Sequence, residues 1–216
     1  MSQHVAMEIN KIKAQLTWHL FISHDNESDF PYIASFPEEQ AHNIYLTVGN
    51  DEDSLALLHE LVHAKFAETI SPMFSSSIYG MDVPKEQIEA VERIVYTAVN
   101  WFVDGEVARL CPDEFSQAVA ARVSLSLGQV QRFTPDCPFF WGNVLLIAQN
   151  IKYRQITPPM DEKTGALVNI ILATPTDNPT EESLLALINS LAAFTTHYQI
   201  GVILNKHRPI FTIQDK

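Results

Sequence analysis

Residues 85–110 carry apolar side chains at helical spacing along their whole length, and Cys111-Pro112 follows directly. Residues three and four positions apart share one face of an α-helix, so this spacing predicts a single long helix. Proline lacks the backbone N–H that a helix interior needs, and Pro112 therefore predicts where this helix ends. The apolar positions are Ile88, Val91, Val95, Val99, Phe102 and Val103.

Patterns over the rest of the chain predict an α+β protein that is mainly helical and has a small sheet. Further helices are expected at 54–69, 113–127, 139–154 and 180–198, and residues 5–22 also have helical spacing. β-Branched and aromatic residues predict strands at 32–36, 43–48, 200–204 and 210–213. Segment 165–174 fits either a buried strand or a short helix.

The length and composition favour one folded domain. A chain of 216 residues buries about 70% of its unfolded surface, which is enough for a single core. The Pro-rich stretch 157–164 is the candidate boundary, so a single domain over 1–216 is expected, with 1–156 and 165–216 as the alternative division.

The charge balance argues against a nucleic-acid-binding protein, and the absence of long apolar runs argues against a membrane protein. The formal net charge is −12, from 14 Lys and Arg against 26 Asp and Glu, which argues against binding nucleic acid by neutralising phosphates. No apolar run is long enough to cross a membrane, and the N-terminus has no signal-peptide pattern. We therefore expect a cytoplasmic protein that binds neither nucleic acid nor membrane.

The stretch His59-Glu60-Leu61-Val62-His63 is the most informative about chemistry. Two histidines at positions i and i+4 lie on one helix face, one turn apart, where both imidazoles can reach one metal ion. Zinc accepts neutral nitrogen ligands of this kind. Glu60 is not needed as a ligand and lies where it can take a proton from water beside the metal.

This HExxH helix, preceded by a predicted strand, resembles that of the zincin metallopeptidases. The resemblance covers about residues 43–110 and implies a zincin-like core and a peptide or protein substrate. It further implies one Zn²⁺ per chain, held by His59 and His63, with Glu60 as the catalytic base. Strand 43–48 would then pair with an extended substrate as an added edge strand. The HExxHxxGxxH branch is excluded, because no glycine or third histidine follows His63 at the required positions.

The third metal ligand must come from elsewhere, and helix 85–110 is the expected donor. Glu92, Tyr96, Asn100 and Asp104 recur every four residues and form one polar stripe. The glutamate branch of zincins has E-x-x-x-D on this helix with the Glu as ligand, whereas this chain has Asn100 in that position. Asp104 is the preferred third ligand, and Glu92 and Glu106 are the alternatives. Asn100 is expected to contact a ligand rather than the metal itself.

These features predict a zinc-dependent metallopeptidase, a hydrolase that uses metal-activated water. The alternative is a zincin-like metal-binding protein without proteolysis, which acts as a binding or regulatory module. A third reading is a helical interaction protein with no metal. The intact Glu60 favours the first, and Tyr79, His197, Tyr198 and His207 are further candidates for donors to an oxyanion.

Overall fold

The computed structural model describes residues 2–28, 30–47, 54–126, 138–205 and 208–216. Over these ranges the protein is mainly helical and has two small sheets, so the predicted α+β class is confirmed. The helices are α1 (Gln3–Gln15), α2 (Ser54–Thr69), η1 (Pro72–Phe74), α3 (Lys85–Leu110), α4 (Pro112–Ser126), α5 (Pro138–Arg154), α6 (Glu162–Leu172) and α7 (Glu181–Thr195). The strands are β1 (His19–Asp25), β2 (Tyr32–Phe36), β3 (Ala41–Thr47), β4 (Tyr198–Asn205) and β5 (Arg208–Asp215).

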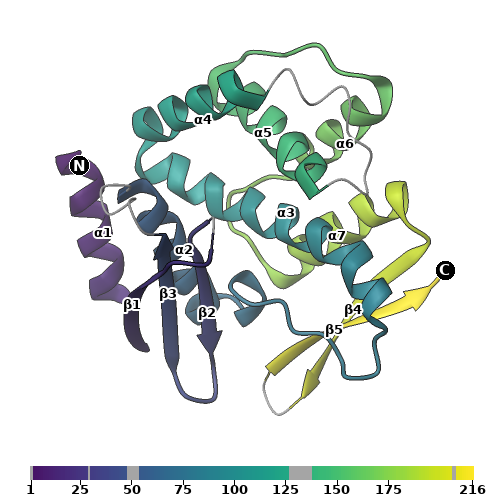
Figure 1. Cartoon of the computed structure of the whole chain (residues 1–216), viewed down its shortest axis with the longest axis horizontal. Coiled ribbons are helices and arrows are strands. Elements are labelled where there is room, and N and C mark those ends of the chain that lie inside the picture. Colours follow the sequence, from purple (N-terminus) through teal and green to yellow (C-terminus); the bar gives the residue numbers. More distant parts are fainter. Residues whose placement is uncertain (1, 29, 48–53, 127–137, 206–207) are drawn as a thin grey trace.

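The long helix α3 crosses the middle of the molecule and contacts α2 from the N-terminal half and α5 and α7 from the C-terminal half (Figure 1). Its side chains Trp101, Phe102 and Val103 are fully buried. One cluster of buried apolar side chains runs from Val5 in α1 to Ile213 in β5, on both sides of segment 157–164. Both halves of the chain therefore pack around this helix.

A close approach of the chain to α3 depends on Gly105. A Cβ at this position would lie 2.4 Å from the Cβ of Thr176, which is far inside van der Waals contact. Nearby, the indole N–H of Trp101 donates to the carbonyl of Thr174 over 2.9 Å. Glycine at 105 therefore lets the segment after α6 lie directly against the buried half of α3.

The larger sheet has the strand order β1-β3-β2. Strand β3 is central: it pairs in parallel with β1 and antiparallel with β2, and its fully buried Ile44 lies opposite both Ile22 and Ile33. Because β3 has a neighbour on each side, the prediction that strand 43–48 pairs with a substrate is wrong. Over the described residues, the outer strands of this sheet are β1 and β2.

Most element predictions are confirmed, and the clearest error concerns β1. Helices α2 and α3 and strand β2 have the expected bounds, and the ambiguous segment 165–174 lies mostly in helix α6. The helical spacing over 5–22, however, continues past the end of α1 into a strand. The helix ends because the backbone N–H groups of Thr17 and Trp18 donate to the carboxylate of Glu68 instead.

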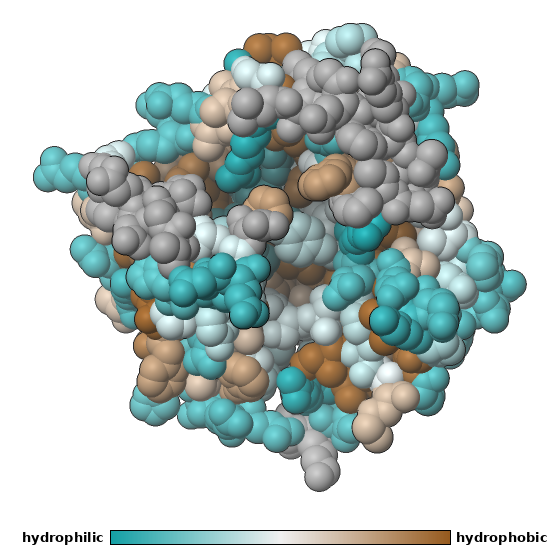
Figure 2. Space-filling model, viewed as in Figure 1, coloured by the Kyte–Doolittle hydropathy of each residue, from teal (hydrophilic) through white to brown (hydrophobic). Residues whose placement is uncertain are grey.

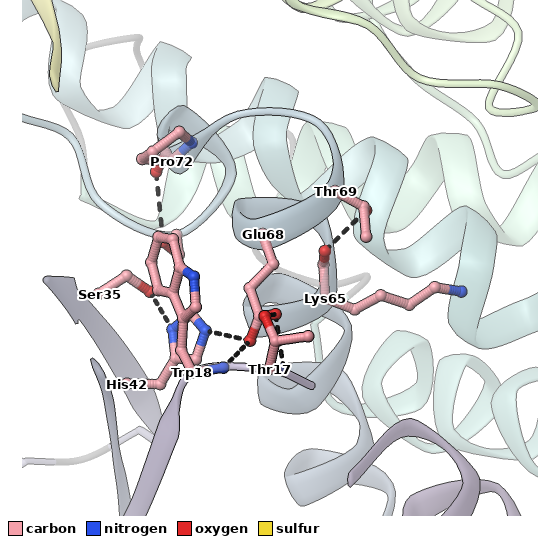
Figure 3. Close-up of polar contacts among 9 residues, drawn as sticks. Thr17, Trp18, Ser35, His42, Lys65, Glu68, Thr69 and Pro72 are labelled. Carbon is pink, nitrogen blue, oxygen red and sulfur yellow. Dashed lines mark hydrogen bonds and ion pairs between the residues drawn. The ribbon is translucent and has the colours of Figure 1, made fainter. Parts of the chain in front are cut away.

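Glu68 fastens three parts of the N-terminal half together at the end of α2 (Figure 3). One oxygen accepts from the backbone N–H and the hydroxyl of Thr17, at 2.8 and 2.6 Å. The other accepts from the backbone N–H of Trp18 at 3.0 Å and pairs with Nε2 of His42 at 3.1 Å. His42 is fully buried, bonds Ser35 through Nδ1 at 2.7 Å and stacks on Trp18. The sheet is thereby joined to the helix that carries the histidine pair.

Replacing Glu68 with Ala should lower the free energy of unfolding by about 2–3 kcal/mol, because the carboxylate loses its bonds to Thr17 and Trp18 and its contact with the buried His42. Chemical denaturation monitored by circular dichroism measures the change. Glu38→Ala is the matched control, since Glu38 is exposed, and it should change stability by less than about 0.5 kcal/mol. Equal stability of both variants would show that the Glu68 contacts are not stabilising.

Hydrophilic residues cover most of the face seen in Figure 2, hydrophobic residues lie in scattered groups, and the face is hollowed near its centre.

None of the described helices is long and apolar enough to cross a membrane.

Candidate metal centre

His59 and His63 lie on one face of α2, as their spacing predicts, and their rings meet. The two Nε2 atoms are 3.0 Å apart. Within the described part of the chain, His59, Glu60 and His63 form the group whose ligand atoms lie close enough together to hold a metal ion, all within 4.8 Å of one another. Leu58, Leu61 and Val62 on the same helix are fully buried and anchor this stretch in the core.

The Nδ1 atom of each histidine contacts an oxygen on the outer side of its ring. Nδ1 of His63 bonds the backbone carbonyl of Phe74, in the short helix η1. Nδ1 of His59 lies 3.0 Å from a carboxylate oxygen of Asp104, on α3. A carbonyl or carboxylate oxygen only accepts, so each Nδ1 carries the ring proton and each neutral ring turns the lone pair of Nε2 inward.

Asn100 adds a third atom to this point. Its side-chain oxygen Oδ1 lies 2.8 Å from Nε2 of His59. The orientation of the amide is set by its other end, where Nδ2 donates to the backbone carbonyl of Tyr96 over 2.8 Å. Because that carbonyl can only accept, the oxygen and not the nitrogen of Asn100 faces the histidines.

Three lone-pair atoms therefore converge on one small space: Nε2 of His59, Nε2 of His63 and Oδ1 of Asn100. With both rings neutral, no proton lies between these atoms, and their partial negative charges repel one another at about 3 Å. A positive charge at this point, from a proton or a metal cation, relieves that repulsion. The arrangement can therefore accept a cation, either a proton or a metal ion.

The two rings differ in how readily they take a proton. Burial lowers the pKa of His63 to about 3, and the charge of His59 also lowers it. The hydrogen bonds with the Phe74 carbonyl and with Asn100 act in the opposite direction and raise it. Burial also opposes protonation of His59, but the adjacent Asp104 carboxylate outweighs it and raises the pKa of that ring. Of the two rings, His59 is therefore the one that takes up a proton more readily.

Asp104 lies on the opposite side of the His59 ring from the converging atoms. One of its oxygens contacts Nδ1 of His59, and the other accepts from the side-chain amide of Gln149, on α5, over 2.5 Å. Asp104 is 3% exposed and both its oxygens are engaged. The structure therefore does not bring Asp104 to the position expected of a third ligand, because Nδ1 of His59 faces away from the point where the two Nε2 atoms meet. Asp104 instead orients His59.

The two alternative carboxylates also lie elsewhere. Glu106 bonds Nζ of Lys65 at 2.8 Å and the guanidinium of Arg109 at 2.7 and 2.8 Å. Although burial opposes it, these two cations lower the pKa of Glu106 to about 2. Glu92 is exposed, two helical turns before Asn100, and its charge acts on Tyr79. Neither side chain is brought to the histidine pair.

Glu60 lies beside the histidines and is 6% exposed. Burial raises the pKa of Glu60 above its usual range, while the charge of His59 opposes that rise. A carboxylate whose pKa is moved toward neutrality is a better acceptor for a proton from water. The predicted position of Glu60 next to the histidine pair is thus present in the structure.

The remaining predicted donors lie outside this cluster or outside the described residues. Tyr79 packs against Phe211 where the loop after η1 meets β5. His197 and Tyr198 line a separate surface pocket of about 440 Å³. His207 lies outside the described residues.

A second histidine-centred chain, Ser35–His42–Glu68, has the connectivity of a nucleophilic triad. Ser35 is 2% exposed and His42 is fully buried, so a substrate cannot reach the hydroxyl. We interpret these hydrogen bonds as a structural contact that joins the sheet to α2 (Figure 3).

Comparison with protein-family models, with curated proteins and with solved structures finds no match to this chain.

Proposed function

We propose that this protein is a zinc-dependent metallopeptidase with a zincin-like core, in which Nε2 of His59 and Nε2 of His63 hold the metal. The observation that carries the proposal is the inward convergence of these two nitrogens, each with its Nδ1 proton fixed by an oxygen acceptor. Such outer contacts are the usual way in which a protein orients histidine ligands.

The distance between the two Nε2 atoms is close to that of two nitrogen ligands on one zinc ion. Two nitrogens bound at 2.0–2.1 Å in tetrahedral geometry lie about 3.3 Å apart. The observed separation is 3.0 Å, so the rings need to part by only about 0.3 Å. When bound, zinc would supply a Lewis acid that polarises a carbonyl and makes water more acidic.

Glu60 would provide the general base for hydrolysis. As the oxygen of a water molecule bonds to the carbonyl carbon of the substrate, Glu60 takes one proton from that water. As the C–N bond breaks, Glu60 gives the proton to the leaving nitrogen, which departs as an amine.

The test is a peptide-library screen with the purified protein before and after metal removal. We expect cleavage by the zinc-loaded protein, its loss on treatment with a chelator, and its return when Zn²⁺ is restored. A zinc-loaded protein that cleaves no peptide would instead support the alternative of a metal-binding module without proteolysis. Cleavage that persists after complete metal removal would contradict the proposal.

A further inference from the structure

We propose that the side-chain oxygen of Asn100 is the third protein donor to the metal, so that the ion is held by three uncharged groups. This inference deepens the proposed function and rests on it. It departs from the expectation that a carboxylate supplies the third ligand and that Asn100 contacts a ligand rather than the metal.

The first support is the position of the amide oxygen. Oδ1 of Asn100 lies 2.8 Å from Nε2 of His59, the same nitrogen that faces Nε2 of His63. A residue that only orients a ligand contacts it from the side away from the metal, as Asp104 and Phe74 do at the two Nδ1 atoms. Asn100 contacts the metal-facing side instead.

The second support is that this oxygen is held in place. Asn100 is 3% exposed, and its Nδ2 is engaged by the backbone carbonyl of Tyr96, one turn earlier on α3. The amide cannot turn its nitrogen toward the histidines without losing that bond. A buried side chain with a fixed orientation is a preorganised ligand, which needs little further ordering when an ion binds.

The third support is the engagement of the competing carboxylates. Asp104 bonds His59 and Gln149, and Glu106 bonds Lys65 and Arg109, so each would have to break two contacts to reach the ion. Glu92 is exposed on an earlier turn of the helix. The oxygen of Asn100, by contrast, already lies at the two histidines.

A neutral donor set has a chemical consequence. Two imidazoles and one amide are uncharged, so these ligands do not neutralise the two positive charges of the ion. The nearest described negative charges are then Glu60, which lies beside the histidines, and Asp104, which acts through His59. Such a site should bind zinc more weakly than one with a carboxylate in the position of Asn100.

The experiment measures zinc affinity by competition with a chromophoric chelator for the wild type, Asn100→Ala and Asn100→Asp. Asn100→Ala should weaken zinc binding by about 100-fold or more, beyond the usual range for outer contacts. Asn100→Asp is nearly isosteric and adds a charge, so it should strengthen binding by about tenfold or more. Thr97→Ala is the control, because Thr97 is buried on the same helix and its hydroxyl bonds the carbonyl of Arg93, one turn earlier.

The visible absorption of the Co²⁺-loaded protein gives a second readout, since it depends on the donor atoms and their geometry. We expect the Asn100 variants to change this spectrum and Thr97→Ala to leave it unchanged. If the wild type binds zinc but both Asn100 variants match its affinity and its Co²⁺ spectrum, Asn100 is not a ligand, while the proposed function stands. If the wild type binds no zinc, the proposed function fails and this inference fails with it.

Discussion

Replacing Glu60 with Gln should reduce peptide hydrolysis by about 10²–10⁴-fold or more, because the amide cannot accept a proton from water. The two side chains are nearly equal in size, so the buried position beside His59 and His63 should remain filled. Zinc content and thermal stability should therefore stay close to those of the wild type. The loss should appear in kcat, since the proton moves in the transition state.

The measurement compares initial rates of the two zinc-loaded proteins on any peptide that the wild type cleaves. Glu38→Gln serves as the control, because Glu38 is an exposed carboxylate, and it should retain wild-type rates. Equal rates for the wild type and Glu60→Gln would show that Glu60 is not the base.

The sequence predicts elements well where a periodic apolar face packs into the core. The bounds of α2 and α3 follow from the spacing of side chains such as Leu61 and Val95, which the structure buries completely. Strand β1 is missed because the preceding helix ends at a contact with a residue that is distant in the sequence. The backbone of Thr17 and Trp18 bonds Glu68, about 50 residues away in the sequence. A helix pattern cannot show a contact of this kind.

The site likewise has one part that the sequence predicts and another part that depends on how the helices pack. The histidine pair is visible in the sequence because its geometry is local to one helix turn. The contacts of Asp104 and Asn100 depend on how α3 lies against α2, and the contact of Asp104 with Gln149 depends also on α5. The stripe on α3 indicates which residues share a face. It does not indicate which of them reaches the inner or the outer side of the His59 ring.

The backbone contact of His63 gives no sequence signal at all. Its partner is the carbonyl of Phe74, a group that every residue carries. Only the position of η1 after α2 brings that carbonyl to the ring. Side-chain type alone could not have predicted this contact.

Removing both histidines should abolish zinc binding. The double variant His59→Ala/His63→Ala leaves Asn100 and Glu60 as the described donors at this point, and two oxygen donors do not make a stable zinc site. Each imidazole is also oriented by an outer contact that has no function once the ring is gone. We therefore expect the zinc affinity to fall by several orders of magnitude, far more than for any single outer residue.

The most direct measurement is the zinc content, by elemental analysis, of the wild type and this double variant purified side by side. A metal site at the histidine pair predicts about one zinc per chain in the wild type and about none in the variant, with circular dichroism showing that both are folded. Equal zinc content in the two proteins, or no zinc in a wild type that has been offered the metal, would contradict it.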